Sequence, residues 1–474
     1  MKEINSKLSY STPKGRTIST LAMVLMSYLV FILAGTFVLM APFSSREHIA
    51  TGFIDAIFTA TSATCVTGLV VFDTYQYWST IGQLVILFMI QMGGIGFMSV
   101  IAFLTRSLRV KMSFKDRKFL MESVGIKKKG DFGSVLRNIV LGSVIMETVG
   151  AALLSIRFIP QFGVADGIYF AAFHSISAFC NAGFDLMGAL GVPFGSLTSY
   201  ANDWLVNLVI CGLIFMGGLG FIVWDDLIDS KFKFKDMSLH SKLMIIGSLF
   251  LVIISTFIFF IFEANHLYKG MSFGEAFLRS FFASVTARTA GFNTTDMTDF
   301  GQGSVFFTII LMFIGGGSGS TAGGIKVTTS IIIFLGILAL NTKDGEIILA
   351  GKKIGKDTLH QAFAVLATYM ILAAVFTAVI LGIDTELTTQ QALFEVVSAI
   401  GTVGIAIGDT TLMLNPASRI AIAILMYIGR VGILTIVLSF AKPKRTNNVI
   451  IPEENVMVGW YFLNFLILYA LYML

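Results

Sequence analysis

The stretch Ser62-Ala-Thr-Cys-Val-Thr-Gly-Leu69 lies between two long apolar runs, and it is too polar for a membrane span and too uncharged for an ordinary loop. Three later segments resemble it, because each of the four has a phenylalanine ten positions before a glycine. The pairs are Phe58/Gly68, Phe173/Gly183, Phe281/Gly291 and Phe394/Gly404. The glycines are 115, 108 and 113 residues apart, and this spacing indicates a fourfold internal repeat.

The composition indicates what kind of molecule carries this repeat. Of the 474 residues, 55% are hydrophobic and 13% are charged, and the mean hydropathy is +0.84. A soluble domain of this composition would expose large apolar surfaces to water, so a polytopic membrane protein is predicted. The three cysteines lack metal-ligand spacing and the five histidines are scattered, so we expect neither a zinc site nor an enzyme.

Long apolar segments recur along the chain and predict eight membrane spans. They cover residues 17–43, 79–105, 135–160, 202–228, 242–264, 303–340, 358–383 and 416–441. Clusters of lysine and arginine, such as 231–235 and 442–445, are separated by even numbers of spans and therefore lie on one side. The positive-inside rule makes that side the cytoplasm, so both ends of the eight-span unit are predicted to be cytoplasmic in the plasma membrane. Their position beside the spans favours topology over nucleic-acid binding as the cause of these clusters.

Each of the four glycines lies in a short segment between two spans. Roughly 10 to 14 apolar residues are too few to cross a membrane, and they fit a re-entrant helix. Irregular backbone survives at membrane depth only where it is buried or lines a water-filled cavity, so four such segments should share one axis. The predicted fold is an all-α polytopic membrane protein with four M1-P-M2 repeats, that is, eight transmembrane helices and four re-entrant pore helices around one central pore. For any one segment, an ordinary outer loop with a turn glycine is the alternative.

The repeats have predicted boundaries. They cover residues 15–110, 130–230, 240–342 with a broken second helix, and 356–445, and a C-terminal tail covers 446–474. A G-x-x-G pattern begins 25 residues after the repeat glycine at Gly93, Gly316 and Gly429, and nine residues later than that register at Gly217. The apolar end of the tail, 459–474, is short for a span, and its role stays open.

The ends of four converging re-entrant helices favour a cation, because each helix directs its negative C-terminal dipole toward the axis. Glycine permits the backbone conformations in which carbonyl oxygens replace the hydration shell of an ion. The predicted filter residues are Val66, Thr67, Gly68, Asn181, Ala182, Gly183, Thr289, Ala290, Gly291, Thr402, Val403 and Gly404. These arguments leave potassium and sodium undistinguished.

An aspartate follows each glycine within a few residues. The four are Asp73, Asp185, Asp296 and Asp409. At the outer mouth of a pore, a ring of negative charge raises the local cation concentration. The alternative is that these are ordinary solvated acids of surface loops.

A run of glycines interrupts the sixth apolar segment and predicts a broken helix, since each glycine costs roughly 0.5–1 kcal/mol relative to alanine in a helix. The run is Gly315, Gly316, Gly317, Ser318, Gly319, Ser320, Thr321, Ala322, Gly323 and Gly324, followed by Lys326. We expect this loop to have little packing of its own and to be held by polar contacts. Close helix packing through small residues is the alternative.

Two charged residues lie inside predicted spans, where charge is costly and usually functional. Arg430 occupies the second position of the fourth G-x-x-G, at the expected depth of the glycine run. It is a candidate pore residue, and a structural role in bonding helix-end carbonyls is its alternative. Glu147 is the other, and the sequence offers it no evident partner.

The four motifs VTGL (66–69), NAGF (181–184), TAGF (289–292) and TVGI (402–405), in one M1-P-M2 register, resemble the Trk/Ktr/HKT superfamily, most closely its bacterial KtrB-type subunits. The resemblance covers about residues 15–458. It implies potassium translocation, since glycine in all four filter segments goes with potassium selectivity in that family. It also implies that the glycine run is an intramembrane loop that obstructs the pore, with Arg430 as an electrostatic barrier beside it.

The resemblance further implies partners. Subunits of this type work as homodimers on a cytosolic ring of RCK-type, KtrA-like subunits that bind ATP or ADP, and this chain has no nucleotide-binding fingerprint of its own. The basic segments 106–129 and 231–242 are candidate docking surfaces, with lipid headgroup anchoring as the alternative. No cofactor is expected in this chain. A potassium channel-like transporter and a sodium-coupled potassium symporter cannot be distinguished from the filter residues.

Overall fold

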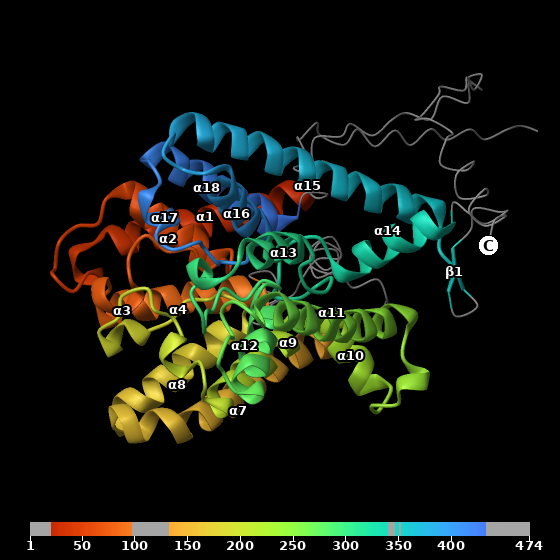
Figure 1. Cartoon of the computed structure of the whole chain (residues 1–474), viewed down its shortest axis with the longest axis horizontal. Coiled ribbons are helices and arrows are strands. Elements are labelled where there is room, and N and C mark those ends of the chain that lie inside the picture. The colour runs from red at the N-terminus through yellow and green to blue at the C-terminus, as the bar shows by residue number, and fades with distance from the viewer. Residues whose placement is uncertain (1–19, 97–131, 340–346, 350–351, 433–474) are drawn as a thin grey trace, which may run out of the picture. The chain divides into compact units, whose positions relative to one another are not determined.

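The computed structural model describes residues 20–96, 132–339, 347–349 and 352–432 (Figure 1). By their contacts, residues 1–439 form one unit and residues 440–474 form a second. The second unit, the predicted tail 446–474 and the basic segment 106–129 lie outside the described residues. The described part is mostly helical (Figure 1).

The main helices follow one another in four groups, and each group contains a first helix, a shorter second helix and a third helix. The first helices are α1 (Thr20–Met40), α7 (Phe132–Phe162), α11 (Leu239–Glu263) and α15 (Lys356–Ile383). The second helices are α2 (Phe53–Thr64), α8 (Val164–Phe179), α12 (Phe273–Thr286) and α16 (Thr389–Gly401). The third helices are α4 (Thr80–Ile95), α9 (Trp204–Leu219), α13 (Gln302–Phe313) and α18 (Pro416–Val431). This order has the register of the sequence repeat.

Smaller elements join or extend these groups. They are α3 (Thr74–Tyr77), α10 (Phe221–Asp229), α14 (Val327–Ala339), α17 (Thr410–Met413), and the 3-10 turns η1 (Pro42–Ser44), η2 (Met187–Leu190), η3 (Thr198–Tyr200), η4 (Phe234–Asp236) and η5 (Met297–Asp299). An antiparallel pair, β1 (Ile348–Leu349) and β2 (Lys352–Lys353), precedes α15, with Ile348 opposite Lys353. The predicted all-α fold did not include this strand pair.

Among the described residues, three helices are long and apolar enough to cross a membrane: 137–162, 239–263 and 356–383. Helices α9 and α10 together make a fourth candidate, bent by 87° at Gly220. Shorter apolar helices cover 25–40, 80–95, 302–313 and 327–339.

Three of the third helices, α4, α9 and α18, end at glycines, which corrects a prediction. The sequence predicts a break only in the span 303–340, whereas α9 also ends inside the predicted span 202–228. The glycine that follows α4, α9 and α18 has a φ of 88° at Gly96, 100° at Gly220 and 91° at Gly432. Side chains other than glycine rarely adopt such angles, so the second glycine of G-x-x-G ends each of these helices.

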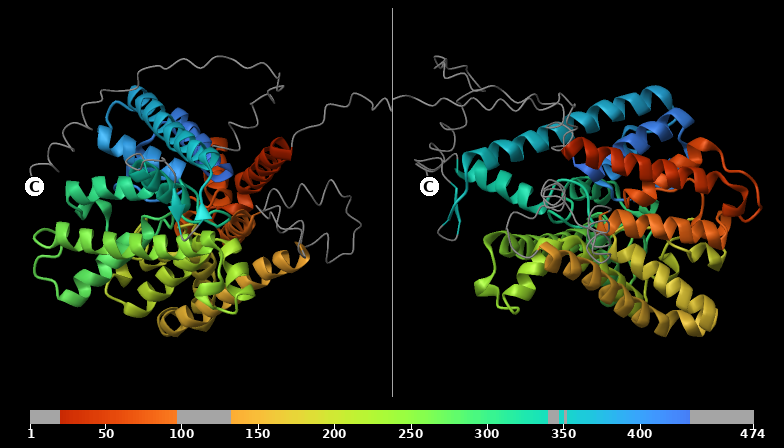
Figure 2. Two further views of the ribbon diagram at one scale, coloured as in Figure 1. Left: turned by 90° about the vertical axis from the view of Figure 1, so that its right-hand side faces the viewer. Right: turned by 180° about the vertical axis from the view of Figure 1, so that it is seen from behind.

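The four groups close into a ring. Each third helix packs against the second helix of the next group, and the last group returns to the first: α4 contacts α8, α9 contacts α12, α13 contacts α16, and α18 contacts α2. In Figure 2 the groups can be followed by colour, from red and orange for the first to blue for the fourth. The four glycine segments follow the C-terminal ends of the second helices within a few residues, so the predicted site begins there.

Candidate functional site

The four glycine segments, residues 66–68, 181–183, 289–291 and 402–404, meet one another directly. A Cβ atom placed on each glycine would lie 2.6 Å from Ala182 O for Gly68, 2.8 Å from Ala290 O for Gly183, 2.9 Å from Val403 O for Gly291, and 2.0 Å from Thr67 O for Gly404. Each glycine thus faces the carbonyl that precedes the glycine of the next segment. The four segments follow one another around a closed ring, and only glycine leaves room for the neighbouring carbonyl.

The backbone of the four glycine segments repeats the same unusual conformation. The glycines have φ values of 98° (Gly68), 72° (Gly183), 78° (Gly291) and 89° (Gly404). The residues two positions earlier also have positive φ: 50° (Val66), 58° (Asn181), 71° (Thr289) and 50° (Thr402). Left-handed backbone at a β-branched residue such as Val66 is rare and strained, and such strain clusters at functional sites.

Hydroxyl groups at the ends of the second helices hold the glycine segments. Ser62 and Ser398 each accept a hydrogen bond from the N–H of the glycine six residues later, at 3.1 Å. Ser177 instead donates to the carbonyl of Phe184 at 2.7 Å. In the third segment Thr286 makes the equivalent bond to the carbonyl of Phe292. Ser62, Ser177 and Ser398 lie six residues before their glycines, whereas Thr286 lies five residues before Gly291. A search for hydroxyl residues at one fixed spacing would therefore miss Thr286.

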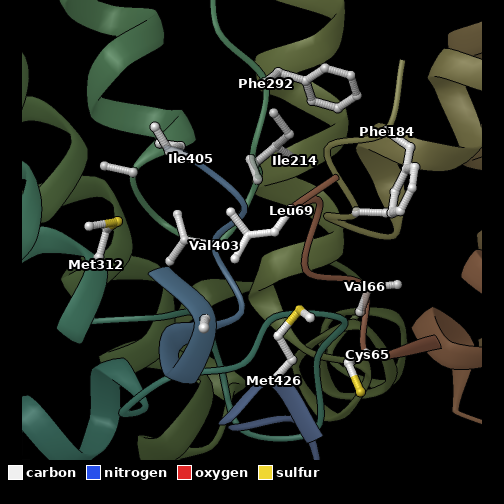
Figure 3. Close-up of a cluster of buried hydrophobic side chains, with 14 of the residues drawn as sticks. Cys65, Val66, Leu69, Phe184, Ile214, Phe292, Met312, Val403, Ile405 and Met426 are labelled. Atoms are coloured by element: carbon white, nitrogen blue, oxygen red, sulfur yellow. The ribbon is translucent and has the colours of Figure 1, made fainter. Parts of the chain in front are cut away.

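The residue after each glycine anchors its segment in the apolar core. These residues are Leu69, Phe184, Phe292 and Ile405, and all are almost fully buried. Figure 3 shows them in the core around the glycine segments, with Met312 and Met426 nearby. Apolar packing fixes the segments from one side, and this leaves their backbone free to face the ring.

A pocket of about 470 Å³ opens over the ring. Its lining includes all four glycines, Gly68, Gly183, Gly291 and Gly404, and all four predicted acids, Asp73, Asp185, Asp296 and Asp409. The structure therefore brings together eight residues that the sequence had singled out separately. Asp299 and Arg279 also line the pocket, and the sequence pattern did not identify them.

The acids also have local structural roles. Asp73 caps α3 by accepting from the N–H groups of Tyr75 and Gln76 at 3.0 and 2.8 Å, and it accepts from the N–H of Phe194 at 2.9 Å. Asp296 accepts from the N–H of Thr298 at 2.8 Å. Asp73 and Asp296 therefore act both as loop caps and as pocket lining. For Asp185, burial first and the neighbouring Asp73 second raise the pKa to about 7.

The glycine-rich loop, residues 315–324, crosses the other end of the ring. The hydroxyl of Thr321 donates to Asn181 Oδ1 at 3.1 Å, in the second glycine segment. A Cβ on Gly323 would lie 2.1 Å from Thr402 Oγ1, in the fourth. The second and fourth segments are opposite one another in the ring, so a loop that touches both passes beneath its axis.

Close packing of the glycine-rich loop corrects the expectation that it has little packing of its own. A Cβ on Gly315 would lie 2.1 Å from Gly323 O, and one on Gly317 would lie 2.3 Å from Leu219 O. The loop is also hydrogen-bonded to the end of α9, through Gly317 N to Gly218 O at 2.7 Å. Its glycines are required because backbone approaches backbone from several sides.

Arg430 joins the glycine-rich loop to the first group. Its guanidinium donates to the carbonyls of Thr321 and Gly93, and to that of Gly94 at 3.2 Å. The side chain therefore bonds helix-end carbonyls of α4, as its structural alternative predicted, and at the same time touches the loop. Lys326 folds back on the loop and donates to the carbonyls of Ala322 and Gly323 at 2.7 and 3.3 Å.

Two buried charged side chains lie close to the ring. Glu147 on α7 accepts from Gln91 Nε2 on α4 at 3.0 and 2.9 Å, a partner 56 residues away that the sequence did not reveal. Arg288, three residues before Gly291, donates to the carbonyl and hydroxyl oxygens of Ser248 at 3.3 and 3.1 Å. Arg288 is not among the predicted site residues, although a cation inside an apolar segment is a signal for a functional residue.

A ring of backbone carbonyls beneath an acidic pocket, set in a bundle of apolar helices, is the arrangement of a membrane transport protein. Residues 16–449 match the family model described as TrkH, cation transport protein. The chain therefore belongs to this family of cation transport proteins, and it is not an enzyme.

Individual relatives cover nearly the whole chain. The potassium/sodium uptake protein NtpJ of Enterococcus hirae is 38% identical over 94% of this chain and 98% of its own length. The Ktr system potassium uptake protein B of Bacillus subtilis is 38% identical over 91% of this chain and 95% of its own. The crystal structure of the potassium transporter TrkH from Vibrio parahaemolyticus has the same fold, with a TM-score of 0.70 and 17% identity over 90% of this chain and 86% of that one.

Proposed function

We propose that this chain takes up potassium ions across the plasma membrane through the ring of the four glycine segments. One observation carries the proposal: the four glycines and the four predicted acids line the same pocket. Acids at the mouth would concentrate cations, and the carbonyls of Thr67, Ala182, Ala290 and Val403 would replace their hydration shell. The names of the relatives as potassium uptake proteins support this choice of ion.

In this proposal the chain forms eight transmembrane helices and four re-entrant pore helices. The second helices α2, α8, α12 and α16 are the pore helices, and both ends of the eight-span unit are cytoplasmic. Apolar side chains such as Phe250, Phe257 and Ile261 are 61%, 57% and 67% exposed on α11, which suits a surface that faces lipid. The basic clusters beside the spans support the orientation.

The glycine-rich loop is the proposed gate. It runs beneath the ring between opposite segments, and Arg430 holds it to α4, so it obstructs the path while these contacts persist. A cytosolic nucleotide-binding ring of RCK type, acting on a homodimer of this chain, would open it. Relatives that are 38% and 33% identical to this chain are named as parts of a Ktr system, and this name supports a partner of this kind.

Reconstitution tests the proposal. The purified chain in liposomes, with an inward rubidium gradient, should take up rubidium, and external potassium should inhibit this uptake more strongly than sodium does. A nucleotide-binding partner with ATP should raise the flux. Uptake that sodium and potassium inhibit equally would contradict the choice of ion, and no uptake under any condition would contradict transport itself.

Sodium-coupled potassium symport on the same scaffold is the second candidate. The observation that favours it is the relative named a potassium/sodium uptake protein, at 38% identity. Counting the sodium ions that enter per potassium ion in sealed vesicles distinguishes the two candidates. A fixed stoichiometry supports symport, whereas potassium uptake that continues without sodium supports a channel-like path.

A further inference from the structure

Asn181 occupies an unusual position in the ring. It lies two residues before Gly183, where the other segments have Val66, Thr289 and Thr402. Its Nδ2 donates to Thr289 Oγ1 at 3.3 Å, in the next glycine segment. Its Oδ1 accepts from Thr321 Oγ1 at 3.1 Å, in the glycine-rich loop. One amide therefore bonds both a neighbouring segment of the ring and the loop beneath it.

Thr321 is held equally firmly on the loop side. It is fully buried, its N–H donates to Gly217 O at 3.4 Å, and its carbonyl accepts from Arg430. With its hydroxyl on Asn181, every polar group of Thr321 is bonded to a different part of the site. The loop cannot leave the ring without breaking the bond to Asn181.

We propose that the Asn181–Thr321 hydrogen bond couples the glycine-rich loop to the ring, with Asn181 as the positioning residue. While the loop is in place, the bond fixes the Asn181 amide and, through Thr289, the register of the second and third segments. When the loop moves away, Oδ1 loses its donor at the inner end of the ring. This inference rests on the proposed function of the ring and the loop.

The coupling has a physical consequence for the permeant ion. A buried carbonyl oxygen without a partner is costly, so a released Oδ1 needs a new one. A potassium ion or its hydration water at the inner end of the ring can supply it. The ion and the Thr321 hydroxyl then compete for one oxygen, and an ion that binds only the open state shifts the loop toward it. Basal flux and ion discrimination should therefore change together.

Thr321→Val tests the bond, because valine keeps the size of threonine and removes the hydroxyl. Rubidium uptake into liposomes without partner should rise about two- to threefold, the lower part of the range expected for losing one hydrogen bond between neutral groups. In the same variant the preference for potassium over sodium should fall, since the Asn181 amide loses its fixed orientation. Thr321→Ser keeps the hydroxyl and should restore both values toward those of the wild type.

A double-mutant cycle separates coupling from two independent defects. Asn181→Leu in the Thr321→Val background should add little to the rise in basal flux, because the bond is already lost. Ser62→Ala is the matched control: Ser62 bonds Gly68 within its own repeat, so its effect should multiply with that of Thr321→Val.

Every outcome of these experiments either supports or contradicts the proposed coupling. Increased flux with unchanged discrimination, or effects of Asn181 and Thr321 that multiply independently, would overturn the coupling and leave the gating role of the loop intact. Unchanged flux and unchanged discrimination in Thr321→Val would overturn it as well. If the wild-type protein takes up no rubidium under any condition, the proposed function itself has failed, and the inference fails with it.

Discussion

The third group of helices differs from the other three at one place. In the first, second and fourth groups, the first glycine of G-x-x-G packs on the last carbonyls of a second helix. A Cβ there would lie 1.9 Å from Thr64 O for Gly93, 1.9 Å from Phe179 O for Gly217, and 2.1 Å from Ile400 O for Gly429. In the third group, Gly316 lies in the glycine-rich loop, where a Cβ would instead lie 2.5 Å from the Ala322 Cβ and 2.8 Å from Gly218 O of the second group.

The G-x-x-G glycines therefore have two different structural roles in one molecule. Three groups use glycine to press two helices together, so they build a rigid frame for the ring. The third group gives up that contact and passes its chain beneath the ring, where it bonds α9, Asn181 and Arg430. The four glycine segments have equivalent backbones, as an ion path along one axis requires. The glycine-rich loop is present in one group only, as expected of an element that controls that path.

Substituting one of the four ring glycines should have the largest effect on ion discrimination, because the four segments are then no longer equivalent. In Gly404→Ala the added methyl group would lie 2.0 Å from Thr67 O at a φ of 89°, so the segment must shift. We expect the preference for potassium over sodium to fall about tenfold or more, because carbonyl geometry sets selectivity. Gly68→Ser should act in the same direction. Competition of sodium with rubidium uptake measures both.

Gly382→Ala on α15 is the control for these variants, because within the described residues its Cβ would meet nothing beyond its own helix within 4 Å. It should leave discrimination at the wild-type value. Unchanged discrimination in Gly68→Ser and Gly404→Ala would show that the ring is not the filter.

Deleting most of the glycine-rich loop, the feature that distinguishes the third group, should have the next largest effect on transport. Deleting Gly316 to Thr321 joins Gly315 to Ala322, which is sterically feasible because Gly315 already contacts Gly323 and Gly324. The deletion removes the contacts to Asn181 and Arg430, so we expect basal rubidium flux to rise about tenfold and to depend less on the partner. A folded deletion protein whose flux stays at the wild-type basal level would show that the gate lies elsewhere.

Weakening the hold on the loop should have a smaller effect. Arg430→Ala loses the bonds to Thr321, Gly93 and Gly94 but leaves the loop in the path. Basal flux should rise about threefold. Arg430→Lys keeps the charge but cannot bond both elements as the planar guanidinium does, so its flux should be intermediate. If lysine matches the wild type, charge alone is the barrier and the bonds contribute nothing.

The acids over the ring are not equivalent either, and this asymmetry should give the smallest effect. With a pKa of about 7, Asp185 is mostly neutral below that pH and mostly charged above it. At subsaturating potassium, uptake should therefore rise about twofold between about pH 6 and about pH 8, through attraction of cations to the pocket. Asp185→Asn should flatten this rise.

Raised ionic strength with an impermeant salt is the control for the pH dependence. Screening should reduce it, because Asp185 acts on cations in the open pocket, and salt limits the range of charge interactions through water to roughly 10 Å at 0.1 M. A pH dependence that persists unchanged in Asp185→Asn belongs to another group.

Part of the site could be predicted because it depends on residues that are close together in the sequence. A positive φ requires glycine at Gly68 and its three equivalents, and the fourfold register exposes that requirement. The glycine run broke a helix as expected. Other features do not show in the repeat pattern. The Gln91–Glu147 pair joins residues 56 apart, and Thr286, which bonds the Phe292 carbonyl, does not share the spacing of the serines in the other segments.

The packing of the glycine-rich loop is the clearest example of a feature that the sequence alone does not predict. Glycine content alone indicates low helix propensity and conformational freedom, and both favour a loose loop. The same glycines pack closely when other chain segments approach them, as Gly217, Leu219 and Thr402 do here. Whether a glycine is a flexible joint or a tight contact depends on its neighbours in space.

The sequence by itself determined the membrane class, the fourfold repeat, the positions of the four ring glycines and the break at residues 315–324. These follow from hydropathy, spacing and the backbone preferences of glycine, and each of these properties acts over a few residues. Only the tertiary structure decided the order of the segments around the ring, the common pocket of the four acids, and the contacts of Asn181 and Arg430 with the loop. Those depend on how separate helix groups pack, and packing is set by the shapes of surfaces that are far apart in the chain.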